Sequence, residues 1–149
     1  MARYSLLGQR TASATLAVLS STADATRPRR GKWYFATFGS EAAAADNPFL
    51  WQLQRCTTAG TSTPVTPQQI DPGDAATEFD GGHIHTVNPT FTANAFMFSI
   101  PLNQRSTYRW EAPLYGEPTW PATASNGFGV LTLVSAAVLI TITAHVEEQ

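Results

Sequence analysis

The residues of this chain best suited to chemistry are two histidines, His83 and His85, separated by one residue. On a β-strand, residues i and i+2 point to the same side, so the two imidazoles could share one metal ion. Three carboxylates lie shortly upstream of the pair: Asp74, Glu78 and Asp80. Known jelly-roll metal sites that use such a pair also have a carboxylate a few residues after it, followed by a glycine, but residues 86–89 read Thr-Val-Asn-Pro. We therefore predict two exposed histidines on a loop strand, with no metal and no other cofactor.

The sequence carries no motif for nucleophilic or phosphoryl chemistry. Cys56, the single cysteine, has no glycine-rich turn beside it, and no serine occupies a G-x-S-x-G turn. The phosphate-binding patterns G-x-x-x-x-G-K and G-x-G-x-x-G do not occur. A glycosidase-type pair of carboxylates has no set spacing in sequence, so that alternative stays open among the eleven acidic residues. We predict that the protein is not an enzyme.

Charge is scarce along the chain. Only 13% of the residues are charged, against about 25% in an ordinary soluble domain, and the net charge is −2. The one basic cluster, Arg27-Pro28-Arg29-Arg30, is too short for a nucleic-acid surface, and we interpret it as an exposed turn. No stretch approaches the roughly 20 apolar residues of a membrane-spanning helix. We expect neither a nucleic-acid nor a membrane partner. A surface of small neutral groups is easily desolvated, which favours assembly with copies of the chain or with another protein shell.

Apolar residues alternate with a period of two in several segments, which is typical of half-buried β-strands. The segments expected to form strands, in chain order, are 4–7, 14–19, 32–38, 49–56, 96–102, 107–110, 128–132 and 138–146. Short strands, turn-rich loops and the lack of a long amphipathic helix predict an all-β fold. The expected architecture is a single domain over residues 1–149, an antiparallel β-sandwich with a jelly-roll as the favoured version.

The sequence also predicts local details of this sandwich. The core rows are expected to include Phe96, Phe98, Ile100, Val138, Ile140 and Ile142. Residues 41–46 are expected to form a single helical turn that ends at Asn47-Pro48. Gly127 and Gly129, two glycines within a strand, indicate a β-bulge.

Two irregular stretches interrupt the strand pattern. Residues 57–88 are rich in proline and glycine, and we expect an extended loop excursion with one short strand near its end. Residues 113–126 hold Tyr115 and Trp120 among three prolines. Exposed aromatic side chains are typical anchors of protein interfaces, so Trp33, Tyr115 and Trp120 are the candidate interface anchors. Each of the three is equally well explained as a core residue.

Three phrases of the sequence carry a resemblance. Residues 51–62 (WQLQRCTTAGTS), 100–110 (IPLNQRSTYRW) and 124–127 (ASNG) resemble stretches of structural proteins from tailed bacteriophages. The similarity spans roughly residues 49–131 and contains no catalytic motif. It implies a small, β-rich virion protein that is made in the host cytoplasm.

This resemblance implies an auxiliary role, because the chain is short for a principal shell protein. Capsid decoration (cement) proteins are similar in size and β-content. The implied function is that of a decoration protein on the capsid surface, which binds the major capsid protein, forms homotrimers and clamps adjacent coat subunits. Two alternatives remain: a phage tail, neck or fibre component, and a carbohydrate-binding β-sandwich that uses an exposed tryptophan as its sugar platform.

Overall fold

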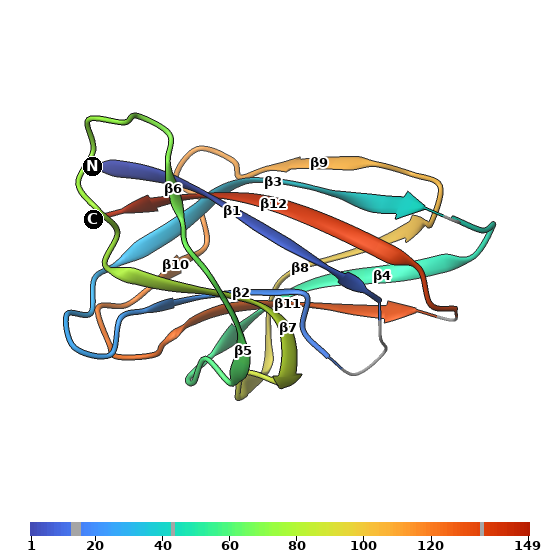
Figure 1. Cartoon of the computed structure of the whole chain (residues 1–149), viewed down its shortest axis with the longest axis horizontal. Coiled ribbons are helices and arrows are strands. Elements are labelled where there is room, and N and C mark those ends of the chain that lie inside the picture. Colours follow the sequence, from blue (N-terminus) through green and yellow to red (C-terminus); the bar gives the residue numbers. More distant parts are fainter. Residues whose placement is uncertain (13–15, 43, 135) are drawn as a thin grey trace.

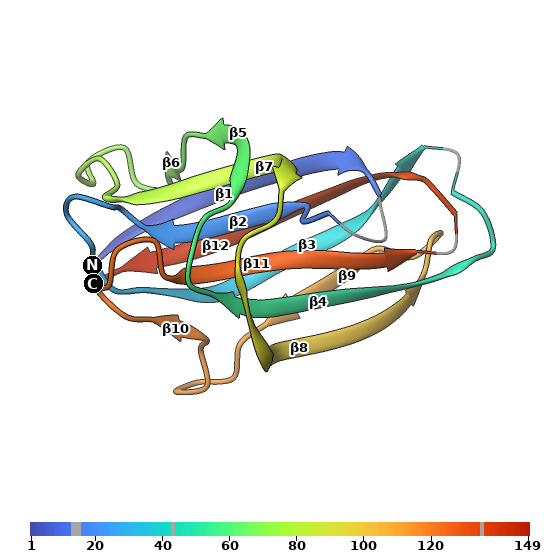
Figure 2. The same ribbon diagram turned by 90° about the horizontal axis from the view of Figure 1, so that it is seen from below.

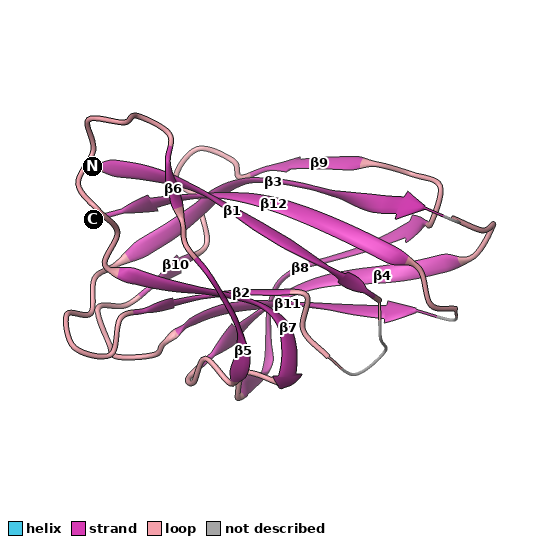
Figure 3. Cartoon of the chain, viewed as in Figure 1, coloured by secondary structure: helices cyan, strands magenta, loops and turns pink. Residues whose placement is uncertain are grey.

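The computed structural model of the chain describes residues 1–12, 16–42, 44–134 and 136–149. This part is built from strands and loops, without a helix (Figure 1, Figure 3). The strands are, in chain order, β1 (Ala2–Thr11), β2 (Leu19–Ala23), β3 (Gly31–Ala42), β4 (Pro48–Cys56), β5 (Thr61–Val65), β6 (Gln68–Gln69), β7 (Phe79–Val87), β8 (Phe91–Asn103), β9 (Tyr108–Glu111), β10 (Thr119–Trp120), β11 (Gly127–Val134) and β12 (Leu139–Glu148). The all-β prediction is confirmed.

The strands form two antiparallel sheets that pack face to face. Sheet A has the order β10-β3-β12-β1-β6, with β9 also paired to β3, and sheet B has the order β5-β7-β2-β11-β4-β8. Seen from below, sheet B lies in front of sheet A, with β8 along one margin and β5 and β7 along the other (Figure 2). This arrangement confirms the predicted antiparallel β-sandwich.

The pairing of the strands is nested. β1 pairs with β12, β2 with β11, β3 with β9, and β4 with β8. Each pair joins one strand from the first part of the chain with one from the last part, and successive pairs fall alternately in sheet A and sheet B. The outermost pair aligns Ala2 with Glu148, so the two termini lie side by side at one end of the sandwich (Figure 1).

The core lies between the sheets and follows the period-two pattern of the sequence. In β12, Ile140 and Ile142 are fully buried, as are Phe128 and Val130 of β11. Val138, just before β12, is also buried, which confirms the expected core row at this end of the chain.

The core row expected in β8 is wrong at Phe96. The ladder between β4 and β8 places Phe98 opposite Leu53 but Phe96 opposite Gln54, so β8 carries one extra residue at this point. Such a bulge reverses the alternation of side chains. Phe98 and Ile100 therefore pack against the core, whereas Phe96 is 43% exposed.

Two local expectations differ from the structure. Glu41 and Ala42 belong to β3, and the described residues 44–46 are not helical, so the expected helical turn is wrong. Pairing with β12 extends β3 to Ala42 and overrides the helix propensity of the alanine run. Of the strand expected over 14–19, residues 13–15 lie outside the described part and β2 begins only at Leu19.

The segment 57–88 extends both sheets. β6 pairs with β1 at the margin of sheet A, while β7 pairs with β2 and β5 with β7 in sheet B. The strand pattern was hidden because β5 contains Pro64 and β7 contains Gly81 and Gly82, residue types that strands usually avoid.

Two connections of this segment cross the outer face of sheet B. β4 and β8 lie at one margin of the sheet and β5 and β7 at the other, so residues 57–60 and 88–90 must run across β11 and β2 (Figure 2). They hold one another: the Thr57 N–H donates to the Thr90 carbonyl at 2.9 Å, and the Thr58 hydroxyl bonds the Thr90 hydroxyl at 2.8 Å. All five residues of β2 are buried.

The glycines of β11 are required by close packing and not by a bulge. The ladder between β11 and β4 runs from Gly127 to Val134 without a register shift, so the expected bulge is wrong. A Cβ at Gly127 would lie 2.0 Å from the Ser21 carbonyl oxygen, and one at Gly129 would lie 2.8 Å from the Phe91 ring. β2 and the crossing chain can approach β11 closely only because these positions lack side chains.

Gly127→Ala tests this close approach. The new methyl group would collide with backbone atoms of β2, which cannot move without breaking the ladder, so we expect a loss of at least about 2 kcal/mol of unfolding free energy or a failure to fold. Gly73→Ala is the matched control, since its Cβ would meet only the Asp71 side chain, at 3.3 Å. Urea denaturation monitored by circular dichroism measures both. Equal midpoints for the two variants would contradict the packing described for Gly127.

Candidate functional site

His85, the second histidine of the pair, serves the fold, whereas His83 is half-buried. His85 is buried, and its Nδ1 lies 3.1 Å from the Ala17 carbonyl oxygen while its Nε2 lies 3.0 Å from the Ser20 hydroxyl. A carbonyl oxygen only accepts hydrogen bonds, so the Nδ1 carries the proton and the Nε2 accepts from Ser20. The prediction of two exposed histidines is therefore wrong for His85. Ile84 between them has a left-handed backbone (φ 48°), which breaks the regular alternation that the prediction assumed.

The described residues contain no group of three or more metal-ligating side chains. Cys56 ends β4 in a buried position, and burial raises the pKa of its thiol to about 12. A thiol with this pKa stays protonated at neutral pH and is a poor nucleophile. Burial thus leaves Cys56 without the activation that a nucleophilic thiol needs.

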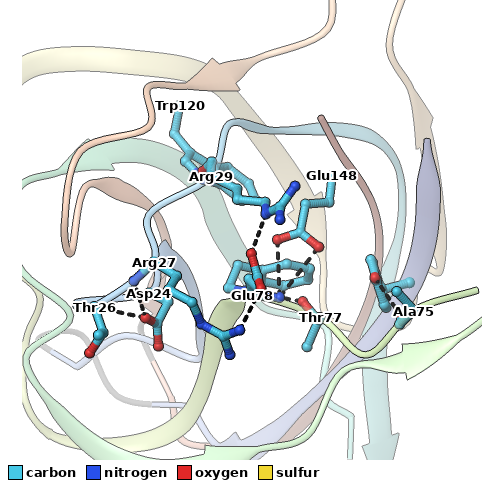
Figure 4. Close-up of polar contacts among 11 residues, drawn as sticks. Asp24, Thr26, Arg27, Arg29, Ala75, Thr77, Glu78, Trp120 and Glu148 are labelled. Atoms are coloured by element: carbon cyan, nitrogen blue, oxygen red, sulfur yellow. Dashed lines mark hydrogen bonds and ion pairs between the residues drawn. The ribbon is translucent and has the colours of Figure 1, made fainter.

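The charged groups gather at the end of the sandwich where the termini meet. Glu78 accepts ion pairs from Arg27, at 2.9 Å, and from Arg29 (Figure 4). The carboxylate of Glu148 accepts the Glu78 N–H, at 3.0 and 3.3 Å to its two oxygens. Burial raises the pKa of Glu148. The same carboxylate, second to burial, helps to raise the pKa of Tyr4 to about 12.

This network explains the basic cluster at 27–30. The expectation of a turn agrees with the structure, in which Asp24 Oδ1 accepts the N–H groups of Thr26 and Arg27, both at 2.7 Å (Figure 4). Two of the three arginines are paired with Glu78, so the cluster binds the chain's own carboxylate. Its role in the described structure is to tie the 24–30 turn to β7 and β12.

Two of the three candidate anchors are core residues. Trp33 and Trp120 are both buried. The Trp33 indole N–H donates to the Ser21 hydroxyl at 2.7 Å, and that of Trp120 donates to the Arg29 carbonyl at 3.1 Å. Their large apolar area and their satisfied N–H groups stabilise the fold, and neither side chain is presented to a partner. The expectation that they anchor an interface is corrected accordingly.

The third candidate, Tyr115, is the most exposed large hydrophobic residue in the described part of the chain, at 92%. Its neighbour Leu114 is 78% exposed. The two form the tip of a tight turn that is closed by a hydrogen bond from the Gly116 N–H to the Pro113 carbonyl at 2.8 Å. Tyr115 has φ +65°, the left-handed conformation that such a turn usually gives to glycine or asparagine. We call residues 113–116 the tip.

An aromatic hollow lies just before the tip in the chain. Its volume is about 550 Å³, and it is lined by Tyr34 and Phe35 of β3, Arg109 and Glu111 of β9, Ala112 just after β9, and His145 of β12. The ladder between β3 and β12 shifts by one residue here, so Trp33 faces the core while both Tyr34 and Phe35 face outward. The sequence offered no signal for this bulge, and the hollow was missed for that reason.

The side chains of the hollow are held against one another. The imidazole of His145 lies 4.7 Å from the Phe35 ring and 5.8 Å from the Tyr34 ring, centroid to centroid. Arg109 stands over the Phe35 ring at 5.2 Å and pairs with Glu111. Burial lowers the pKa of His145, so the imidazole is neutral at neutral pH. The hollow is therefore an aromatic floor with a single ion pair at its rim.

The tryptophan-based sugar platform has no support in the structure. Trp33, Trp51 and Trp120 are buried, and Trp110 packs against the core as a partly buried side chain. A sugar ring stacks on an accessible aromatic face, which none of the four indoles fully presents.

Sequence comparisons with known proteins identify no family and no relative. No family model matches the chain, and no curated protein is detectably similar to it in sequence. In the described part of the chain, no helix is long and apolar enough to span a membrane.

The buried His85 predicts a pH-dependent stability. Burial lowers its pKa, with Arg10 and His83 as charged or titratable neighbours, so the folded protein binds this proton less well than the unfolded chain does. Its contribution to stability is present above the unfolded pKa of about 6.5 and is lost as the pH falls below it. We expect His85→Gln to flatten the decline in melting temperature between about pH 7 and 5. Parallel curves for the variant and the wild type would contradict this assignment.

Proposed function

We propose that this chain is a virion structural protein of a tailed bacteriophage, and that it acts as a capsid decoration protein. In this role it binds the major capsid protein on the outer shell and clamps adjacent coat subunits as a homotrimer. The observation that carries the proposal is the state of Tyr115, which is 92% exposed and left-handed. The resemblance of residues 49–131 to phage structural proteins selects the kind of partner.

Tyr115 is costly in the isolated chain. A left-handed backbone costs a residue other than glycine about 1–2 kcal/mol, and the exposed ring recovers nothing by burial. Glycine at this position would relieve the backbone cost, because glycine adopts a left-handed backbone without strain. The change would remove no ring contact, since Tyr115 makes none among the described residues. A side chain that does not help its own fold is well explained as an anchor for another protein, because tyrosine is among the residues that dominate binding energy.

The strand pairing supports a jelly-roll as the version of the sandwich. A jelly-roll is a nested antiparallel ribbon wrapped into two sheets, and the four nested pairs β1–β12, β2–β11, β3–β9 and β4–β8 fit this description. On this interpretation, β5, β6 and β7 are an insertion that widens both sheets. Jelly-rolls serve viral capsid proteins and also lectins, so the fold is compatible with the proposal without deciding it.

The proposed mechanism of binding is the burial of neutral surface at each contact, repeated over several copies of the chain. Apolar area removed from water contributes about 25 cal/mol per Å², and a surface that is short of charge loses little when it is desolvated. A trimer engages the shell at three points, so that modest single contacts add up to tight binding. The charged network around Glu78 keeps the ionic groups internally paired at the terminal end.

The copy number in purified virions separates decoration from the tail, neck or fibre alternative. Quantitative mass spectrometry of the phage that encodes the chain is expected to find hundreds of copies per particle. A few copies would replace decoration by a tail or neck role. Absence of the chain from purified particles would reject the virion proposal altogether.

Tyr115→Gly tests the anchor. Relief of the left-handed strain should leave the melting temperature unchanged or raise it, by an amount corresponding to about 1 kcal/mol. Attachment to particles lacking the chain, measured by co-sedimentation, should fall by at least about tenfold. Val87→Thr is the control, because Val87 is another exposed apolar residue, on the far margin of sheet B. Wild-type attachment by Tyr115→Gly would show that the tip is not an anchor.

A further inference from the structure

The tip and the aromatic hollow are complementary surfaces of one chain. The tip presents an aliphatic and an aromatic side chain, Leu114 and Tyr115, without covering either. The hollow presents three aromatic rings and an ion pair around about 550 Å³ of open space. We propose that the tip of one copy inserts into the hollow of a second copy. This inference rests on the proposed function and names the partner of the anchor.

The chain cannot make this contact with itself. Ala112 lines the hollow and donates its N–H to the Tyr34 carbonyl at 3.1 Å, which holds the start of the loop against β3. The turn begins at the next residue, Pro113, and leaves Tyr115 92% exposed. A side chain so exposed does not occupy the hollow of its own chain.

The chemistry of the hollow suits a tyrosine. Its floor, formed by the Phe35 ring and the His145 imidazole, offers stacking or edge-to-face contact to an incoming ring. Arg109, already over the Phe35 ring, can take a second ring on its other face, and the rim ion pair with Glu111 excludes water from the contact. The neutral imidazole adds no charge that the contact would have to desolvate.

The tip is organised for binding before it meets a partner. Its backbone is held by the bond from the Gly116 N–H to the Pro113 carbonyl, and Pro113 restricts the chain at its start. A rigid anchor loses little conformational freedom on binding, which favours affinity. The left-handed turn that is unfavourable for the isolated chain thus directs Tyr115 outward in a defined orientation.

We take the contact to be head-to-tail, because a closed ring of three requires it, whereas a reciprocal exchange of tips across a two-fold axis would give a dimer. Head-to-tail contacts generate a closed ring when the rotation between copies closes, and an open filament when it does not. A closed ring of three such contacts is the simplest way to obtain the homotrimer implied by the resemblance. Every copy then contributes one tip and one hollow, and Tyr115 supports attachment to the shell by holding together the trimer that binds it.

Sedimentation of the purified chain tests the contact. We expect the wild type to form a closed oligomer, and Tyr115→Gly and Phe35→Ala each to weaken the association by about 30-fold or more, as expected for a central anchor and its pocket. Circular dichroism establishes that both variants are folded. Val87→Thr is the control that should associate like the wild type. A monomeric wild type, or wild-type association by a folded Tyr115→Gly, overturns the inference.

Cross-linking decides which surfaces meet. Leu114→Cys places a thiol on the tip, Glu111→Cys places one at the rim of the hollow, and the native Cys56 is buried. A mixture of these two variants treated with a short bismaleimide should give a cross-linked dimer that neither variant gives alone. A dimer from Leu114→Cys alone would mean that two tips meet, which overturns the head-to-tail contact.

The outcomes separate this inference from the proposed function. Loss of oligomers in Tyr115→Gly together with a high copy number in virions supports both. A monomeric wild type that still attaches to particles through Tyr115 overturns the inference and leaves the decoration proposal standing. A monomer whose hollow binds a disaccharide probe such as lactose or cellobiose, with the binding lost in Phe35→Ala, also overturns it, because the hollow is then a sugar site.

Discussion

The ladder between β1 and β12 is the interaction on which the rest of the structure depends. It pairs ten residues of each strand, from Ala2 with Glu148 to Thr11 with Leu139. The pair lies in the interior of sheet A, where β3 borders β12 and β6 borders β1. It joins the two ends of the chain, and the pairs β2–β11, β3–β9 and β4–β8 are nested within it. The energetic gain comes from its inward row, which includes the buried side chains of Leu6 and Ile142.

The end of this ladder also determines where charge is placed. Glu147 lies within 3.3 Å of Arg3 and 3.1 Å of Lys32, and Glu148 accepts the Glu78 N–H. These carboxylates are buried or nearly so, and they are tolerated because cations and N–H groups surround them. Much of the chain's small stock of charge is thereby used to hold its termini. The crossing segments over sheet B and the strands of its outer face are left largely neutral, which suits a protein that packs against other proteins.

Two departures from regular backbone geometry occur close together along one edge of sheet A. The bulge in β3 turns both Tyr34 and Phe35 outward, and the left-handed turn at 113–116 turns Tyr115 outward. The bulge interrupts the regular pairing of β3 with β12, and the turn holds Tyr115 in an unfavourable backbone conformation. Both present aromatic side chains at the surface of a protein whose tryptophans are used for the core. These two irregularities are the observations on which the proposed contact between copies rests.

The sequence by itself determined the fold class and most strands, because alternating apolar residues as in 138–146 can bury one face only as a strand. It also showed that charge is scarce, and it included Tyr115 among the candidate anchors. Only the tertiary structure decided that Trp33 and Trp120 are core residues, that Phe96 faces outward, and that the hollow exists. These outcomes depend on register shifts and on strands that meet across more than 80 residues, as β3 and β12 do. A single added residue in a ladder reverses which side chains are buried, and local sequence does not record where that addition falls.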